Sequence, residues 1–214
     1  MKNKEIFLKD ACKSRRPGEY IQWFEAKLHD TRYEYDAMLQ KREFGFKWFY
    51  SELFPLYRLL QQKSSEWKDY HFLPIDGCQN FDVEVQINEK ERHYIEISDS
   101  IMTQQEYKRR LYYVVHGKEF IEDDRELAIK KKTHQCIKDR IMKRINKKMD
   151  VIERPKNTSL LIQINDIEAF RYDSDLSKIE MNEFLDSLRE NVFNRYCALY
   201  LVGISGKSFY EKKR

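Results

Sequence analysis

The sequence predicts an α/β fold: a mixed β-sheet with crossover helices, preceded by a helical N-terminal elaboration. Apolar residues recur every three or four positions through most of the chain, as in amphipathic helices. Short segments with alternating or continuous apolar residues, typical of strands, lie between these helical stretches. Strands separated by helices of this length imply crossover connections. With 214 residues, 14% of them aromatic, the chain is long enough for one domain with a sizeable core.

The first third of the chain is predicted to be helical. Ile21, Phe24 and Leu28 lie on one helix face, and similar spacing continues to Leu60. The expected helices cover residues 18–29, 33–50 and 52–63. We expect a single domain over 1–214, in which 1–70 form the helical elaboration, 71–205 the core and 206–214 a loose basic tail.

The sequence pattern changes from helical to alternating at the turn signal Pro74–Gly77. Residues 81–87 and 94–98 alternate between apolar and polar side chains, which predicts the two strands of a hairpin. The elements expected next are a helical stretch over about 103–150 that is interrupted near Gly117, a strand at Leu160–Ile164, an amphipathic helix at Ser177–Phe193 and a strand at Cys197–Ile204.

Acidic residues gather on one face of the predicted hairpin. Alternation places Asp82, Glu84, Glu96 and Ser98 on the same face. A loop centred on Lys90 would set Glu84 opposite Glu96 and Asp82 opposite Ser98. Like charges across a strand pair repel, so water, basic side chains or a divalent cation must compensate them. The alternative is an ordinary solvent-facing side of a hairpin, without function.

Short motifs in this region resemble the core of the PD-(D/E)XK nuclease-like superfamily. The residues that carry the resemblance are Gly77, Asn80–Val83, Ile95–Ser98, Arg140, Ile141, Ile145, Lys148 and Leu160–Ile162. It covers roughly residues 76–165, and the predicted element order is similar too. The resemblance implies a restriction-endonuclease-like core that hydrolyses phosphodiester bonds with Mg²⁺, or Mn²⁺, as cofactor.

Carried over to this chain, the resemblance makes Asp82 and Glu96 catalytic metal ligands. The lysine that would follow two residues after the second acid is missing, because Ser98 stands there. Some branches of the superfamily supply a basic residue from the next helix, for which Lys148 is the candidate. A further acid from the N-terminal helices often completes such sites, and Glu25 or Glu52 could serve.

The spacing of the following helix supports this role for Lys148. Ile137, Ile141 and Ile145 form a stripe on one face, and Lys148 lies on or beside that stripe, whereas Lys147 points away. We therefore expect Lys148 to face the sheet. The alternative is a lysine at the helix edge that extends into solvent. A rival placement of the motif, with Asp76 and Glu84 as the acids, leaves Glu96 unexplained.

Basic residues are concentrated between Arg125 and Lys148. This segment holds ten Lys and Arg against two acidic residues, although the whole chain carries only +4. A helix of this composition is suited to the phosphate backbone of a nucleic acid, DNA in preference to RNA; otherwise it is a solvated helix. The expected binding residues are Lys130, Lys131, Lys132, Arg140, Lys143, Arg144 and Lys147.

Other functional classes lack sequence support. There is no GxxxxGK[ST], GxGxxG or GxSxG motif, and the four cysteines lie about sixty residues apart without a CxxC pair. No apolar run is long enough for a membrane helix, and we expect a cytoplasmic protein. The sequence thus predicts a magnesium-dependent nuclease or nuclease-derived nucleic-acid-binding protein. The alternative, which Ser98 favours, is an inactive nuclease-like scaffold that binds a protein partner through its N-terminal helices.

Overall fold

The computed structural model describes residues 4–32, 48–77, 79–100, 130–150, 153–166, 174–188 and 190–214. Within these ranges the chain is an α/β protein built on a six-stranded mixed sheet in the order β1-β2-β3-β4-β5-β6. The strands are β1 (His71–Pro74), β2 (Val83–Gln86), β3 (Arg92–Asp99), β4 (Thr158–Ile164), β5 (Ala198–Gly203) and β6 (Phe209–Lys213).

The sheet combines hairpins at its edges with parallel pairing at its centre. β1, β2 and β3 pair antiparallel, β3–β4 and β4–β5 pair parallel, and β6 returns antiparallel to β5. Parallel neighbours require crossover connections. Helix α7 (Lys130–Met149) lies between β3 and β4 in the chain, and α8 (Ser174–Asp186) and α9 (Glu190–Arg195) lie between β4 and β5.

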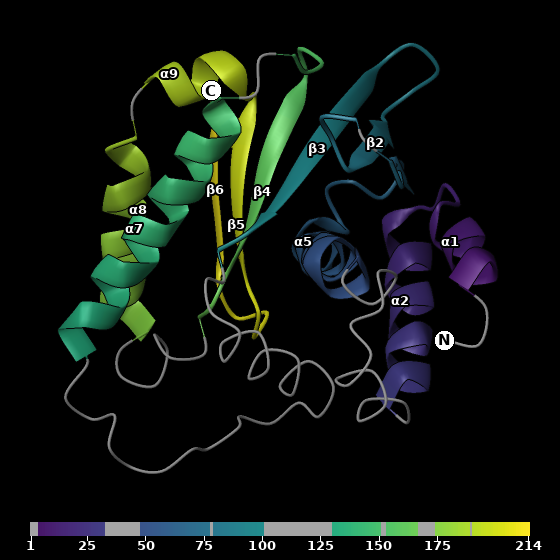
Figure 1. Cartoon of the computed structure of the whole chain (residues 1–214), viewed down its shortest axis with the longest axis horizontal. Coiled ribbons are helices and arrows are strands. Elements are labelled where there is room, and N and C mark those ends of the chain that lie inside the picture. Colours follow the sequence, from purple (N-terminus) through teal and green to yellow (C-terminus); the bar gives the residue numbers. More distant parts are fainter. Residues whose placement is uncertain are drawn as a thin grey trace.

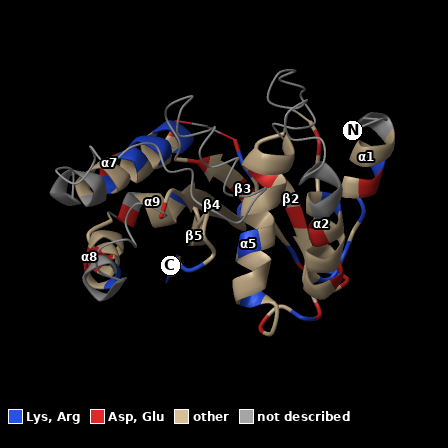
Figure 2. Ribbon diagram, turned by 90° about the horizontal axis from the view of Figure 1, so that it is seen from below, with Lys and Arg blue, Asp and Glu red and all other residues tan. Residues whose placement is uncertain are grey.

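Helices cover both faces of the sheet (Figure 1). The helices α7, α8 and α9 cover one face, where the Ile137, Ile141 and Ile145 stripe packs on Leu160 and Ile162 of β4. The other face is covered by N-terminal helices: α1 (Lys4–Ala11), α2 (Pro17–Arg32), the π-helical turn η1 (Phe49–Leu53) and α5 (Phe54–Lys63). Figure 2 shows the same two layers from a second direction.

Most predicted elements within the described ranges are confirmed. α2 and α5 correspond to the helices expected at 18–29 and 52–63, and β2 and β3 form the expected hairpin. The strands expected at Leu160–Ile164 and Cys197–Ile204 correspond to β4 and β5. Of the helices expected at 33–50 and 103–150, residues 33–47 and 101–129 lie outside the described part. Among described residues, no helix is long and apolar enough to cross a membrane.

The structure adds one strand and corrects two predictions. The added strand is β1, residues 71–74, in which Phe72 is fully buried. The helix expected at Ser177–Phe193 is instead α8 and α9, separated at Ser187 and Leu188. The stretch expected to be a loose tail contains β6, whose Tyr210 is buried while Lys212 and Lys213 suit the exposed edge of a sheet.

The turn between β5 and β6 requires glycine. Gly206 has φ of 77°, a left-handed conformation that costs an L-residue roughly 1–2 kcal/mol. An added Cβ would also approach Arg58 Nη1 within 2.7 Å.

Gly206→Ala is therefore expected to lower the free energy of unfolding by about 1–2 kcal/mol, measured by urea denaturation. As a control, Gly18→Ala in helix α2 meets no atom within 4 Å and should not destabilise. Equal stability of the Gly206 variant and the wild type would contradict this description of the turn.

Candidate active site

Asp82 lies at the point where β2 separates from β3. Its backbone N–H donates to the Ile95 carbonyl at 2.9 Å, and its own carbonyl accepts from Ile75 at 2.9 Å. The Asp82 carboxylate then accepts the Ile97 N–H at 2.5 Å through Oδ2. The side chain thus replaces a backbone acceptor along the edge of β3, which fixes the carboxylate beside that strand.

Glu96 is a buried acid in the middle of β3, with only 3% of its surface exposed. Its Oε1 lies 2.8 Å from the Lys148 ammonium. Its Oε2 accepts a 2.6 Å hydrogen bond from the Tyr196 hydroxyl and lies 3.3 Å from Arg154 Nη2. A buried carboxylate needs such partners because its ionised form loses its hydration inside the protein.

The register of the hairpin differs from the predicted one. Val83 pairs with Ile95 and Glu84 with Tyr94, so that continuing the register sets Asp82 opposite Glu96. The expected Glu84–Glu96 and Asp82–Ser98 pairs are therefore wrong, although the predicted division into two faces is correct. The turn decides the register.

The turn is centred on Glu89, one residue before the expected position. Asn88 Oδ1 accepts the N–H groups of Lys90 and Glu91, both at 2.9 Å, and Ile87 N–H donates to the Glu91 carbonyl at 3.0 Å. Asparagine stabilises tight turns in this way. Because the shift preserves the face of every residue, Asp82 and Glu96 still lie on the same side of the sheet.

Lys148 faces the sheet as its spacing predicted. Ile137, Ile141 and Ile145 are buried, Lys147 is exposed, and the Lys148 side chain is 27% exposed. Besides contacting Glu96, the Lys148 charge also lowers the pKa of Asp82. The structure therefore brings Asp82, Glu96 and Lys148 together.

The pKa values of Asp82 and Glu52 lie well above those of ordinary carboxyl groups. Burial raises the pKa of Asp82 to about 6, and Glu96 adds to the rise, while the Ile97 N–H and Lys148 oppose it. Burial likewise raises the pKa of Glu52 to about 7, with a further rise from Asp82. Glu52 belongs to η1, which packs against β3. Burial is thus the main cause of the raised pKa in both acids, and a neighbouring carboxylate is a smaller one.

Of the two candidates for a further acid, Glu52 lies near the site and Glu25 does not. Glu52 interacts electrostatically with both Asp82 and Lys148. Glu25 instead accepts a 3.0 Å hydrogen bond from the Tyr57 hydroxyl, within the helical layer. Of the rival acids, Glu84 forms an ion pair with Arg92 at 3.0 Å, and Asp76 is exposed in its turn.

Arg154 and Tyr196 belong to this cluster but carry no signal in the sequence. Arg154 Nη2 donates to the Lys148 carbonyl at 2.6 Å, and its guanidinium lies 4.4 Å from the centre of the Tyr196 ring. Arg154 lies in the connection before β4, and Tyr196 lies between α9 and β5. Neither position belongs to a periodic pattern or a motif, so only the folded chain reveals them.

The predicted metal site is only partly assembled. In the described part of the chain, no group of three or more His, Cys, Asp or Glu side chains is arranged to hold a metal ion. Both oxygens of Glu96 already have cationic or hydroxyl partners. Asp82 retains Oδ1 with no hydrogen bond among the described residues. Carboxylate oxygens are nevertheless the donors that Mg²⁺ prefers, and it commonly uses only one or two of them.

The predicted nucleic-acid-binding residues lie along α7, where the described Lys and Arg positions are blue on the ribbon of Figure 2. Lys143 and Lys147 are exposed, whereas Arg140 and Arg144 are half-buried and have partners within the protein. Lys130, Lys131 and Lys132 begin the helix, but their side chains lie outside the described part. Lys143 and Lys147 therefore give the exposed basic surface adjacent to Lys148.

Comparisons with known proteins add no relative. No family model matches the chain, and neither the curated proteins nor the solved structures give a match. The site thus defines the protein by geometry alone: an α/β chain with two acids on neighbouring strands and a lysine from the crossover helix.

The raised pKa of Glu52 gives a prediction about stability. In the folded protein Glu52 keeps its proton up to a pH of about 7, whereas an ordinary glutamate loses it near 4.5. Its contribution to stability is therefore present at acidic pH and decreases as pH rises from about 4.5 to about 7. Glu52→Gln should therefore flatten the decline of unfolding free energy across that range, measured by urea denaturation at several pH values.

The control for this measurement is Glu89→Gln, in the exposed hairpin turn. It should leave the pH dependence as in the wild type. If Glu52→Gln and Glu89→Gln have the same pH profile, Glu52 is not buried beside Asp82 as described.

Proposed function

We propose that this chain is a metal-dependent nuclease of the PD-(D/E)XK-like class. The observation that carries the proposal is the convergence of Asp82, Glu96 and Lys148 on one face of the sheet, with the ammonium 2.8 Å from Glu96. Antiparallel β1–β3 followed by a crossover to the parallel strand β4 supports a restriction-endonuclease-like core.

A divalent cation, Mg²⁺ or Mn²⁺, would be held by Asp82 and Glu96, with Glu52 as a neighbouring acid. When bound, such an ion polarises a phosphate and lowers the pKa of a water ligand. The raised pKa values of Asp82 and Glu52 support the fit, because burial disfavours both ionised carboxylates and a bound cation would favour them. Asp82 Oδ1 is the oxygen that the described contacts leave for a ligand.

Lys148 takes the position of the missing motif lysine. Ser98 is buried and uncharged, so it cannot supply an ammonium group. Lys148 reaches Glu96 from α7 and, within the proposed site, orients the attacking water or neutralises negative charge that develops on the phosphate. Glu52, with its pKa of about 7, can accept a proton and release it again near neutral pH.

Arg154 and Tyr196 position the second acid. Their contacts with Oε2 fix the orientation of the Glu96 side chain, and the bond from Arg154 to the Lys148 carbonyl fixes the end of α7. Such supporting contacts hold reacting groups in place without touching substrate.

A specific observation favours the alternative of an inactive scaffold. Lys148, Arg154 and Tyr196 already satisfy both oxygens of Glu96, as in a purely structural ion-pair cluster. In that case the N-terminal helices are the proposed partner surface, where Ile6 on α1 is 64% exposed. An activity measurement separates the two proposals.

The first experiment measures cleavage of plasmid, linear and single-stranded DNA, and of RNA, in Mg²⁺, Mn²⁺ or EDTA. We expect cleavage of DNA that EDTA abolishes. Asp82→Asn should reduce the rate by about 100-fold or more, and Lys148→Met by about 100-fold, since positioned charges contribute on this order. Glu91→Gln, in the hairpin turn, is the control and should leave the rate unchanged.

Two outcomes would decide against the nuclease. Cleavage that persists in Asp82→Asn would show that another site, or a contaminant, is responsible. Absence of cleavage with every substrate and both metals, in a protein whose fold is intact by circular dichroism, would leave the inactive scaffold as the proposal.

DNA binding provides a separate prediction for α7. A Lys143→Ala/Lys147→Ala variant should bind duplex DNA more weakly, because two exposed charges are lost. The slope of log affinity against log salt should fall by about 2 if each lysine contacts one phosphate. Fluorescence anisotropy between 50 and 200 mM salt would measure this.

The matched control is Lys178→Ala, an exposed lysine of α8. It should leave both the affinity and the salt dependence as in the wild type. If the α7 variant and this control behave alike, α7 is a solvated helix that does not contact DNA.

A further inference from the structure

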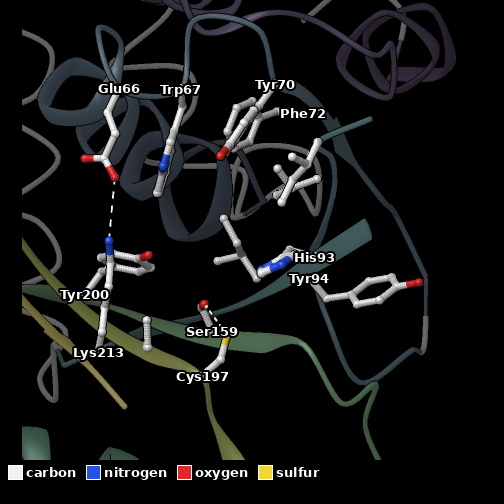
Figure 3. A pocket seen from close by; sticks show the side chains of 14 residues that line it. Glu66, Trp67, Tyr70, Phe72, His93, Tyr94, Ser159, Cys197, Tyr200 and Lys213 are labelled. Atoms are coloured by element: carbon white, nitrogen blue, oxygen red, sulfur yellow. Dashed lines mark hydrogen bonds and ion pairs between the residues drawn. The ribbon is translucent and has the colours of Figure 1, made fainter. Parts of the chain in front are cut away.

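A cavity of about 290 Å³ lies on the face of the sheet that carries Val85 and Ile95, opposite to the Glu96 carboxylate. Figure 3 shows the side chains that line it. Strands β2 to β5 contribute its floor, and the segment from the end of α5 to β1 covers it. Five residues with phenyl, phenol or indole rings line it: Trp67, Tyr70, Phe72, Tyr94 and Tyr200. None of these residues takes part in the proposed nuclease site.

Short side chains on central strands account for the cavity. Ser159 on β4 lies beside Ile95 on β3, and Ala198 begins β5. Both are buried, and both side chains are much shorter than the leucine and isoleucine side chains that fill the rest of the sheet. Leu161 and Val202, further along the same strands, fill this face of the sheet. The small residues therefore leave a space that larger ones would close.

The cavity is large enough for an aromatic compound of two rings. A cavity of about 150 Å³ with apolar walls is sufficient to bind benzene. This one has about twice that volume and flat aromatic walls, with Trp67 and Tyr70 inclined by only 19° at a centroid distance of 6.2 Å. Flat rings bind favourably against such surfaces by stacking.

Polar groups at the cavity distinguish a heteroaromatic ligand from a hydrocarbon. The Ser159 hydroxyl lies 3.1 Å from Cys197 Sγ and hydrogen-bonds the Tyr200 side chain. His93 lies near its opening. Hydroxyl and imidazole groups can each donate and accept hydrogen bonds, so they match the ring nitrogens and amino groups of a heterocycle.

The charges at the rim are already paired. Glu66 contacts Lys63 at 2.7 Å and Lys213 at 3.6 Å, and Lys213 also contacts Glu211 at 2.9 Å. A cationic ligand would need an uncompensated carboxylate, and an anionic one an uncompensated amine. The paired rim therefore favours an uncharged ring.

We propose that this cavity binds a two-ring nitrogen heterocycle, a purine base, presented by a free nucleoside or by an unstacked base of a single strand. The base stacks against one face of this aromatic wall, over Ser159 and Ala198. This inference is independent of phosphodiester hydrolysis, because Asp82 and Glu96 face the other side of the sheet.

The test titrates the protein with adenosine and follows tryptophan fluorescence and binding heat. We expect saturable binding that changes the emission of Trp67. Ala198→Leu should weaken it by about tenfold or more, because the added side chain occupies the ligand space. Ser159→Val fills the same space from β4 and should weaken binding too. Leu199→Met, on the same strand but the opposite face, is the matched control and should bind as the wild type does.

Two further measurements identify the role of Trp67 and the source of the base. Trp67→Phe should lose the fluorescence change but retain the binding heat, since a phenyl ring still stacks. A single-stranded oligodeoxyadenylate that displaces adenosine would assign the site to bases within a strand, and one that does not would assign it to free nucleosides. Asp82→Asn should bind adenosine normally, even if it abolishes cleavage.

Three results would overturn the inference. The first is that the wild type shows no saturable binding of adenosine. The second is that a folded Ala198→Leu or Ser159→Val variant binds adenosine as well as the wild type does. The third is that the protein binds indole but not adenosine. The last result would assign the cavity to apolar rings.

Discussion

The buried charge of Glu96 is the constraint on which the rest of the site depends. Removing one partner from a buried ion pair typically costs about 3–5 kcal/mol, because the remaining charge loses its compensation. Here the partners come from three later parts of the chain: Lys148 from α7, Arg154 from the connection to β4, and Tyr196 from the entry to β5. Glu96 therefore ties β3 to both crossover connections.

Asp82 combines a structural role with the chemical one that we propose for it. Its carboxylate accepts the Ile97 N–H where β2 leaves β3, yet burial and, to a lesser degree, Glu96 raise its pKa to about 6. An acid held in this way lowers stability when it ionises. Such local cost is expected where a side chain is retained for chemistry, which is why the Asp82, Glu52 and Glu96 arrangement supports a cation-binding proposal.

One strand shapes both regions to which we assign binding. Along β3, Ile95 contributes to the floor of the aromatic cavity, while its neighbour Glu96 faces α7. Alternation of side chains across the sheet separates the two regions by the thickness of the sheet. Substitutions at Ala198 and at Asp82 can therefore test them independently.

The sequence by itself determined the elements whose signals are local. Alternation in 81–87 and 94–98 defined the faces of the hairpin, and the spacing of Ile137, Ile141 and Ile145 placed Lys148 toward the sheet. The tertiary structure alone decided the register, through the Asn88 turn, and recruited Glu52, Arg154 and Tyr196. Short edge strands such as β1 and β6 have too few residues for a periodic signal, and they form because a neighbouring strand offers backbone partners. Periodicity reports which face a residue occupies, but contacts between residues distant in sequence depend on how the crossovers pack.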